Sequence, residues 1–94
     1  MANVNLVQLL VDKPNHITCR ELIGAWREKH AQELVDFSDA NLSGMDLSGS
    51  YLEDANFSGA KLVGTSLSGA NLLRANFVGA NMQNADLSRA RLKQ

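Results

Sequence analysis

Residues 39–92 read DANLSGMDLSGSYLEDANFSGAKLVGTSLSGANLLRANFVGANMQNADLSRARL, and a large apolar residue stands at every fifth position. The pattern starts at residue 35 and runs through twelve pentads, with the consensus Ala, Asn or Asp, Leu, Ser, Gly. Because hydrophobic residues make up 45% of the chain, chance does not place so many in one register. The predicted structural core of the repeats is Phe37, Leu42, Leu47, Leu52, Phe57, Leu62, Leu67, Leu72, Phe77, Met82, Leu87 and Leu92.

A period of five fits neither a long helix nor a long strand. Five residues turn an α-helix by about 140 degrees beyond a full turn, so the large residues would define no single face. In a continuous strand an odd period would send successive large residues to opposite sides. A short extended piece followed by a bend in every pentad keeps them all on one side. The repeat therefore predicts a chain that coils around a narrow interior.

The spacing of the phenylalanines indicates the size of each coil. Phe37, Phe57 and Phe77 lie twenty residues apart, which is four pentads. We therefore expect about three coils of four pentads, in which residues twenty apart stack in columns. At a parallel-strand spacing of roughly 4.8 Å, the resulting rod would be about 14 Å long.

The pattern over about residues 35–93 resembles that of the pentapeptide-repeat family. The resemblance implies a right-handed, four-sided parallel β-helix, so the expected fold class is an all-β solenoid with an N-terminal α-helical cap. It implies no enzyme activity and no cofactor. Some members of that family resemble duplex DNA in shape and charge and bind DNA gyrase, a type II topoisomerase.

Residues 1–34 lack the pentad pattern and are typical of helical structure. Thr18 followed by Glu21 forms a capping-box pattern, which predicts a helix from about residue 19 to 33. A shorter helix is expected over residues 4–11. The residues assigned to the helix cap are Thr18, Glu21, Leu22, Ile23 and Trp26.

The sequence predicts two structural parts, a repeat region and an element that covers one end of it. The open end of a repeat structure exposes strand edges and an apolar cross-section, and terminal capping elements usually cover it. We interpret residues 1–34 as an N-terminal helical cap and residues 35–94 as the pentapeptide-repeat β-helix. The alternative is a helix that recruits a partner, which would require its apolar face to stay exposed.

Candidate catalytic or metal-binding residues are few. His16 and Cys19 have a spacing that can suit a metal, but His30 is the single other imidazole and no second pair completes a tetrahedral set. We expect no catalytic site, no metal and no cofactor. A net charge of −1 favours neither nucleic acid nor membrane binding. The N-terminal residues lack a signal-peptide pattern, so we expect a cytoplasmic protein.

Outward-facing residues of the fourth pentad in each coil depart from the consensus. Asp54 and Arg74 lie twenty residues apart and should be stacked neighbours. The plain alternative is a solvated ladder of charges, which contributes less than about 1 kcal/mol to stability. The functional interpretation is a partner-binding wall made of Tyr51, Glu53, Asp54, Leu73, Arg74, Arg91 and Lys93.

The preferred function is a non-catalytic protein–protein interaction module whose protein partner is unknown. The alternative, implied by the family alone, is a DNA mimic that inhibits or modulates DNA gyrase. Residues 36–94 hold six acidic and five basic side chains, whereas a 14 Å mimic of duplex DNA should carry roughly eight negative charges. We also expect a homodimer through the C-terminal coil, over about residues 75–94, because its apolar rim and backbone edge need a partner. The alternative is that Arg89, Arg91 and Lys93 keep this end solvated, because charges on an edge discourage pairing.

Overall fold

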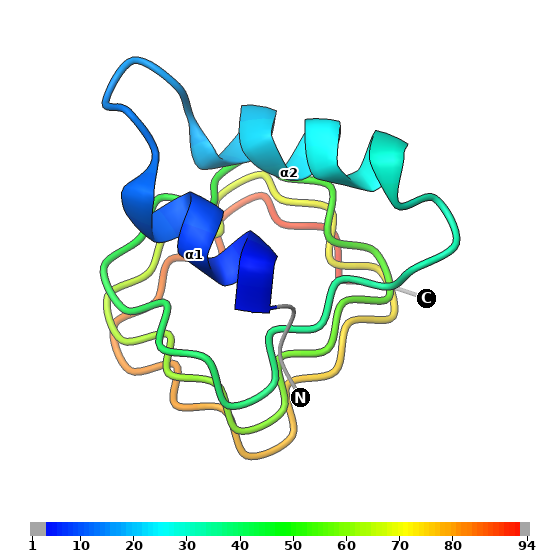
Figure 1. The fold of residues 1–94 in the computed structure, drawn as a ribbon. Coiled ribbons are helices and arrows are strands. Elements are labelled where there is room, and N and C mark those ends of the chain that lie inside the picture. The colour runs from blue at the N-terminus through cyan, green and yellow to red at the C-terminus, as the bar shows by residue number, and fades with distance from the viewer. Residues whose placement is uncertain (1–3, 93–94) are drawn as a thin grey trace.

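The protein, as described by a computed structural model covering residues 4–92, has a helical part followed by a coiled part. Helix α1 spans Val4–Asp12 and helix α2 spans Cys19–Lys29. From Asp36 onward, single extended residues alternate with turns. Figure 1 looks down the axis of the coils and shows α1 and α2 lying across one end of them.

Each pentad forms one bend, and its polar residues stabilise that bend. The N–H of Met45 donates to the carbonyl of Leu42 at 3.2 Å, which closes a β-turn. The third residue of this turn, Gly44, has a φ of +74°, a conformation that glycine adopts without steric cost. Ahead of the turn, the side-chain oxygen of Asn41 accepts the N–H of Ser43 at 3.1 Å. The consensus Asn, Leu, Ser, Gly is thus the sequence of a repeated turn.

Stacked coils are joined by parallel bridges between residues twenty apart. The bridges run from Asp36↔Asn56 to Asn71↔Arg91. A typical hydrogen bond joins the N–H of Phe37 to the carbonyl of Asn56 at 2.7 Å. Because a turn follows every bridging residue, residues 4–92 contain isolated bridges and no continuous β-strand. The extended structure expected for a β-helix is therefore limited to single residues.

The interior is filled by one large side chain per pentad, and burial falls toward the last coil. The fully buried members in the first two coils include Phe37, Leu47 and Leu67, each with no exposed surface. The rings of Phe57 and Phe77 stack with centroids 4.9 Å apart. In the third coil, Phe77, Met82 and Leu87 are partly buried and Leu92 is 49% exposed.

Helix α2 begins at a capping box and ends earlier than the sequence predicts. The hydroxyl of Thr18 accepts the N–H of Glu21 at 3.0 Å, and the Glu21 carboxylate accepts the N–H of Thr18 at 2.9 Å. The predicted end near residue 33 is wrong, because His30 leaves helical geometry with φ −123° and ψ 48°. Its ring folds back and stacks on Trp26 at 4.4 Å.

The buried faces of both helices join the interior of the coils in one hydrophobic cluster. Leu6 and Leu10 of α1 and Ile23 and Trp26 of α2 are buried in the same cluster as Phe37 of the first coil. Leu22, the remaining apolar residue assigned to the cap, packs partly buried against this cluster. The helices therefore cover the apolar cross-section of the first coil.

Candidate interaction surface

We call the outward surface of the fourth pentads the fourth wall; it contains residues 51, 53, 54, 71, 73, 74 and 91. Bridges Tyr51↔Asn71 and Asn71↔Arg91 stack these pentads directly on one another. Lys93, which the sequence also assigns to this wall, lies outside the described residues. The remaining members are therefore held at fixed positions by the backbone ladder beneath them.

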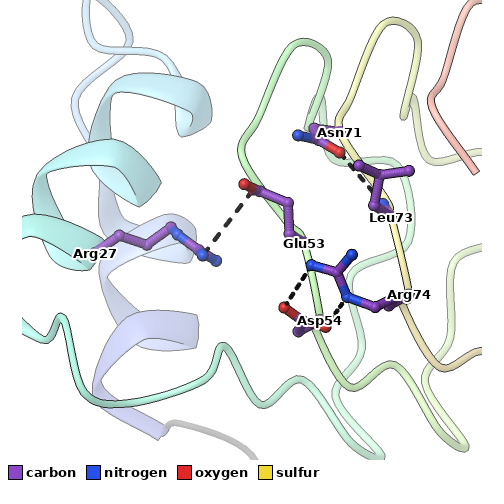
Figure 2. A network of polar contacts seen from close by, with 6 residues as sticks. All are labelled: Arg27, Glu53, Asp54, Asn71, Leu73 and Arg74. Carbon is purple, nitrogen blue, oxygen red and sulfur yellow. Dashed lines mark hydrogen bonds and ion pairs between the residues drawn. The ribbon is translucent and has the colours of Figure 1, made fainter. Parts of the chain in front are cut away.

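Asp54 and Arg74 form a two-point ion pair between the first and second coils (Figure 2). The Arg74 Nε and Nη2 atoms donate to the two Asp54 carboxylate oxygens at 2.7 and 3.2 Å. Arg74 holds the pKa of Asp54 below its ordinary value through this hydrogen bonding. Both residues take the turn position that is glycine in six other pentads, each with a φ of 61°. Asp39, Asn84 and Arg89 share this conformation, one on each of the other three walls. A left-handed conformation costs a residue with a side chain roughly 1–2 kcal/mol, so this wall gives up backbone stability to place two charged groups.

Glu53 connects the fourth wall to the cap. Its Oε1 atom lies 4.0 Å from the Nη2 atom of Arg27 on α2, as Figure 2 shows. Glu53 Oε1 and Arg27 Nη1 are both buried and make no hydrogen bond within the described part of the chain. Arg27 is partly buried, because α2 lies across the end of the coils above Glu53. The sequence does not indicate that Glu53 faces Arg27, because this contact depends on where the whole helix lies on the coils.

The fourth wall also carries exposed groups suited to binding. Tyr51 is 53% exposed, Arg91 is exposed, and the side chain of Arg74 is 54% exposed. Leu73 is partly buried and its N–H donates to the Asn71 side chain at 3.3 Å. Tyrosine and arginine are enriched among the residues that dominate protein–protein binding energy. The arrangement can therefore contact another protein through an aromatic ring and guanidinium groups.

The residues considered for metal binding or catalysis form no such site in the described structure. Cys19 is buried at the start of α2, and desolvation by burial raises the pKa of its thiol, which keeps it protonated at neutral pH. His16 is exposed. Within residues 4–92, no group of three or more His, Cys, Asp or Glu side chains gathers as a metal site would require. Neither described helix is long and apolar enough to cross a membrane.

The pentads agree with a known family pattern. The model of pentapeptide repeats matches this chain in eight copies, over residues 36–72 and 55–94. The chain belongs to the pentapeptide-repeat family. A comparison with curated proteins finds no match to this pentapeptide-repeat chain.

Two solved pentapeptide-repeat proteins resemble the chain. One, from the thylakoid lumen of Arabidopsis thaliana, is 44% identical over 58% of this chain and 38% of its own, with a TM-score of 0.58. The other, Rfr23 from the cyanobacterium Cyanothece 51142, is 31% identical over 61% of this chain and 40% of its own, also at 0.58. The chain thus spans about two fifths of the length of these pentapeptide-repeat relatives.

Proposed function

We propose that this protein is a non-catalytic interaction module that binds another protein through its fourth wall. The observation that carries the proposal is the Asp54–Arg74 pair, in which two side chains occupy positions where glycine is the less strained choice. An exposed ion pair adds at most about 1 kcal/mol, so stability does not account for it. Beside the pair, Tyr51 adds an exposed ring. We also infer that the coils have the right-handed, four-sided form of the family, as the bridges at a spacing of twenty support.

Capture with consensus-restoring variants tests the wall. Tyr51→Asn and Arg74→Gly return two positions to the repeat consensus and should fold normally. Lys61→Asn makes the same kind of change outside the fourth wall, in the pentad of residues 60–64, and serves as the matched control. A partner captured from the source lysate by the wild type and by Lys61→Asn, but lost with Tyr51→Asn and Arg74→Gly, is expected. Equal recovery with all four proteins would contradict the proposal.

The gyrase alternative has a direct assay. The near-neutral charge of residues 36–94 gives a DNA-binding surface on gyrase little to recognise. We therefore expect no inhibition of gyrase supercoiling at micromolar protein. If the protein inhibits gyrase and the Arg74→Gly variant inhibits it equally well, DNA mimicry is the better explanation of its function than binding through the fourth wall.

We further propose that a second copy of the chain covers the third coil. The N–H groups of Phe77, Met82 and Leu87 donate to no described residue, and their side chains are partly buried. A two-fold axis through opposite corners of the coil would exchange the third and fourth walls. This symmetry would place Asp86 of one copy opposite Arg91 of the other, so that the two opposite charges attract across the interface.

Charge reversal tests this dimer. Asp86→Arg and Arg91→Asp should each weaken self-association in sedimentation equilibrium, and the double variant should restore it. Asp46→Arg, on the same wall two coils away, is the control that should have no effect. A wild-type chain that remains monomeric at about 100 micromolar overturns the dimer, because an interface of useful size associates well below that concentration.

A further inference from the structure

Each bridging residue of the second and third coils, from 56 to 91, is joined to the coil before it by its own N–H and carbonyl groups. The N–H of Ser66 donates to the carbonyl of Met45 at 2.9 Å, and the carbonyl of Ser66 accepts the N–H of Leu47 at 2.8 Å. Asp46 stands one coil earlier at the equivalent position. Its N–H donates to no described residue and its carbonyl accepts from none. Asp46 therefore presents a free backbone donor and acceptor toward the cap.

A pocket opens directly above this free edge. It has a volume of about 360 Å³ and lies between Gly44, Met45 and Asp46 on the coil and a set of cap residues that includes Lys13, Ile17 and Cys19. Figure 1 shows the chain between α1 and α2 looping away from the coils. The backbone inside a helix is already hydrogen-bonded to itself, so the cap covers the apolar interior without pairing with Asp46.

We propose that this pocket binds an extended peptide segment of another protein, with a lysine or arginine paired opposite Asp46. The carbonyl preceding that residue accepts the Asp46 N–H, and the N–H following it donates to the Asp46 carbonyl. This is the arrangement of Met45 and Leu47 above Ser66, continued one step toward the cap. Addition of an extended segment to an open edge is an established mode of peptide recognition.

The preference for a cation comes from the stacking of outward side chains. The bridges Asp46↔Ser66 and Ser66↔Asp86 place these residues in one column, so the side chain of an added residue would lie beside that of Asp46. The Asp46 carboxylate accepts the Ser48 hydroxyl at 2.6 Å and the Ser48 N–H at 3.0 Å. Lys13, which lines the same pocket, also helps to lower the pKa of Asp46, but it forms no ion pair with this carboxylate. A lysine or arginine directly beside Asp46 in the column would add that ion pair, and an acidic residue there would be repelled.

The site is separate from the fourth wall and does not rest on the function proposed for that wall. Its probe is the peptide acetyl-Gly-Met-Lys-Leu-Ser-Gly-amide. This is the sequence of residues 44–49 with lysine in place of aspartate, chosen because the natural segment already sits on the second coil in the required way. The peptide is titrated to millimolar concentration into isotope-labelled full-length protein, followed by amide NMR.

We expect the amide signals of Asp46 and Gly44 to shift and hydrogen exchange at Asp46 to slow several-fold. N-methylation of the peptide leucine removes the donor to the Asp46 carbonyl and should weaken binding about tenfold. Asp46→Asn should weaken it about three- to tenfold through the lost charge. Asp86→Asn is the matched control and should have no effect, because the N–H of Asp86 is already bonded to Thr65.

Three results would overturn the proposal. The first is the absence of shifts at Asp46 with millimolar peptide. The second is equal binding of the N-methylated peptide, which would show that the backbone edge is not used. The third is shifts centred on Tyr51 and Arg74, which would place the peptide on the fourth wall.

Discussion

Replacing Ser50 by alanine should make the protein more stable. Ser50 occupies the small inward position that is alanine in most pentads, and it is completely buried. Its hydroxyl oxygen makes no hydrogen bond within the described structure. Thr65, in the second coil, is also fully buried, but its hydroxyl donates to the carbonyl of Leu42 in the first coil at 2.8 Å. Ser50 lies in the first coil itself, where no earlier coil offers such a carbonyl.

The size of the effect follows from this difference. A buried polar group without a partner costs about 1–3 kcal/mol. Loss of one oxygen atom leaves a small void, which costs at most about 0.5 kcal/mol. Ser50→Ala should therefore raise the free energy of unfolding by about 0.5–3 kcal/mol. In a domain of this size, a gain of about 1 kcal/mol corresponds to a rise in Tm of roughly 4–8 °C.

Thermal unfolding by circular dichroism, with urea titration as a second measurement, checks the prediction. The matched variant is Thr65→Val, which keeps the side-chain shape and removes a hydrogen bond that is made. It should lose about 1 kcal/mol and melt roughly 4–8 °C lower. If Ser50→Ala melts below the wild type, the Ser50 hydroxyl has a partner in solution and the reasoning fails.

Three further predictions concern the pentads. Leu67→Lys should abolish cooperative unfolding, because it puts an unpaired charge at a fully buried position, whereas Ser68→Lys should leave a normal thermal transition; equal effects would refute the inward register. The hydroxyl and N–H of Ser48 lower the pKa of Asp46, so this carboxylate stabilises the fold above about pH 4 and loses that contribution as the pH falls through its lowered value. Asp46→Asn keeps the turn acceptor and should flatten the decline of Tm between about pH 5 and 2.5; an unchanged slope would assign the decline to other groups. Arg74→Gly relieves a left-handed residue and breaks an exposed ion pair, so its Tm should stay within roughly 8 °C of the wild type, and a larger fall would show that the pair stabilises the fold.

The coiled part could be predicted from the sequence because its rules are local and repeated. A turn that closes between Leu42 and Met45 depends on residues within the same pentad. Once the pentad is known, the spacing of Phe37, Phe57 and Phe77 gives the number of pentads in a coil, and the contacts between successive rings show that residues twenty apart meet. The position of Asp54 beside Arg74 follows from the same count.

The relation of the cap to the coils follows no such count. The capping box fixes where α2 begins, but the chain leaves helical geometry at His30, whose ring stacks on Trp26, and no residue spacing in the sequence marks that point. The approach of Arg27 to Glu53 depends on how a whole helix lies across a coil, which no spacing between the two residues encodes. The free edge at Asp46 has the same origin, because a helix covers a coil without supplying backbone partners. The surfaces that the sequence left undetermined are therefore those where helix meets coil, and the pocket above Asp46 is one of them.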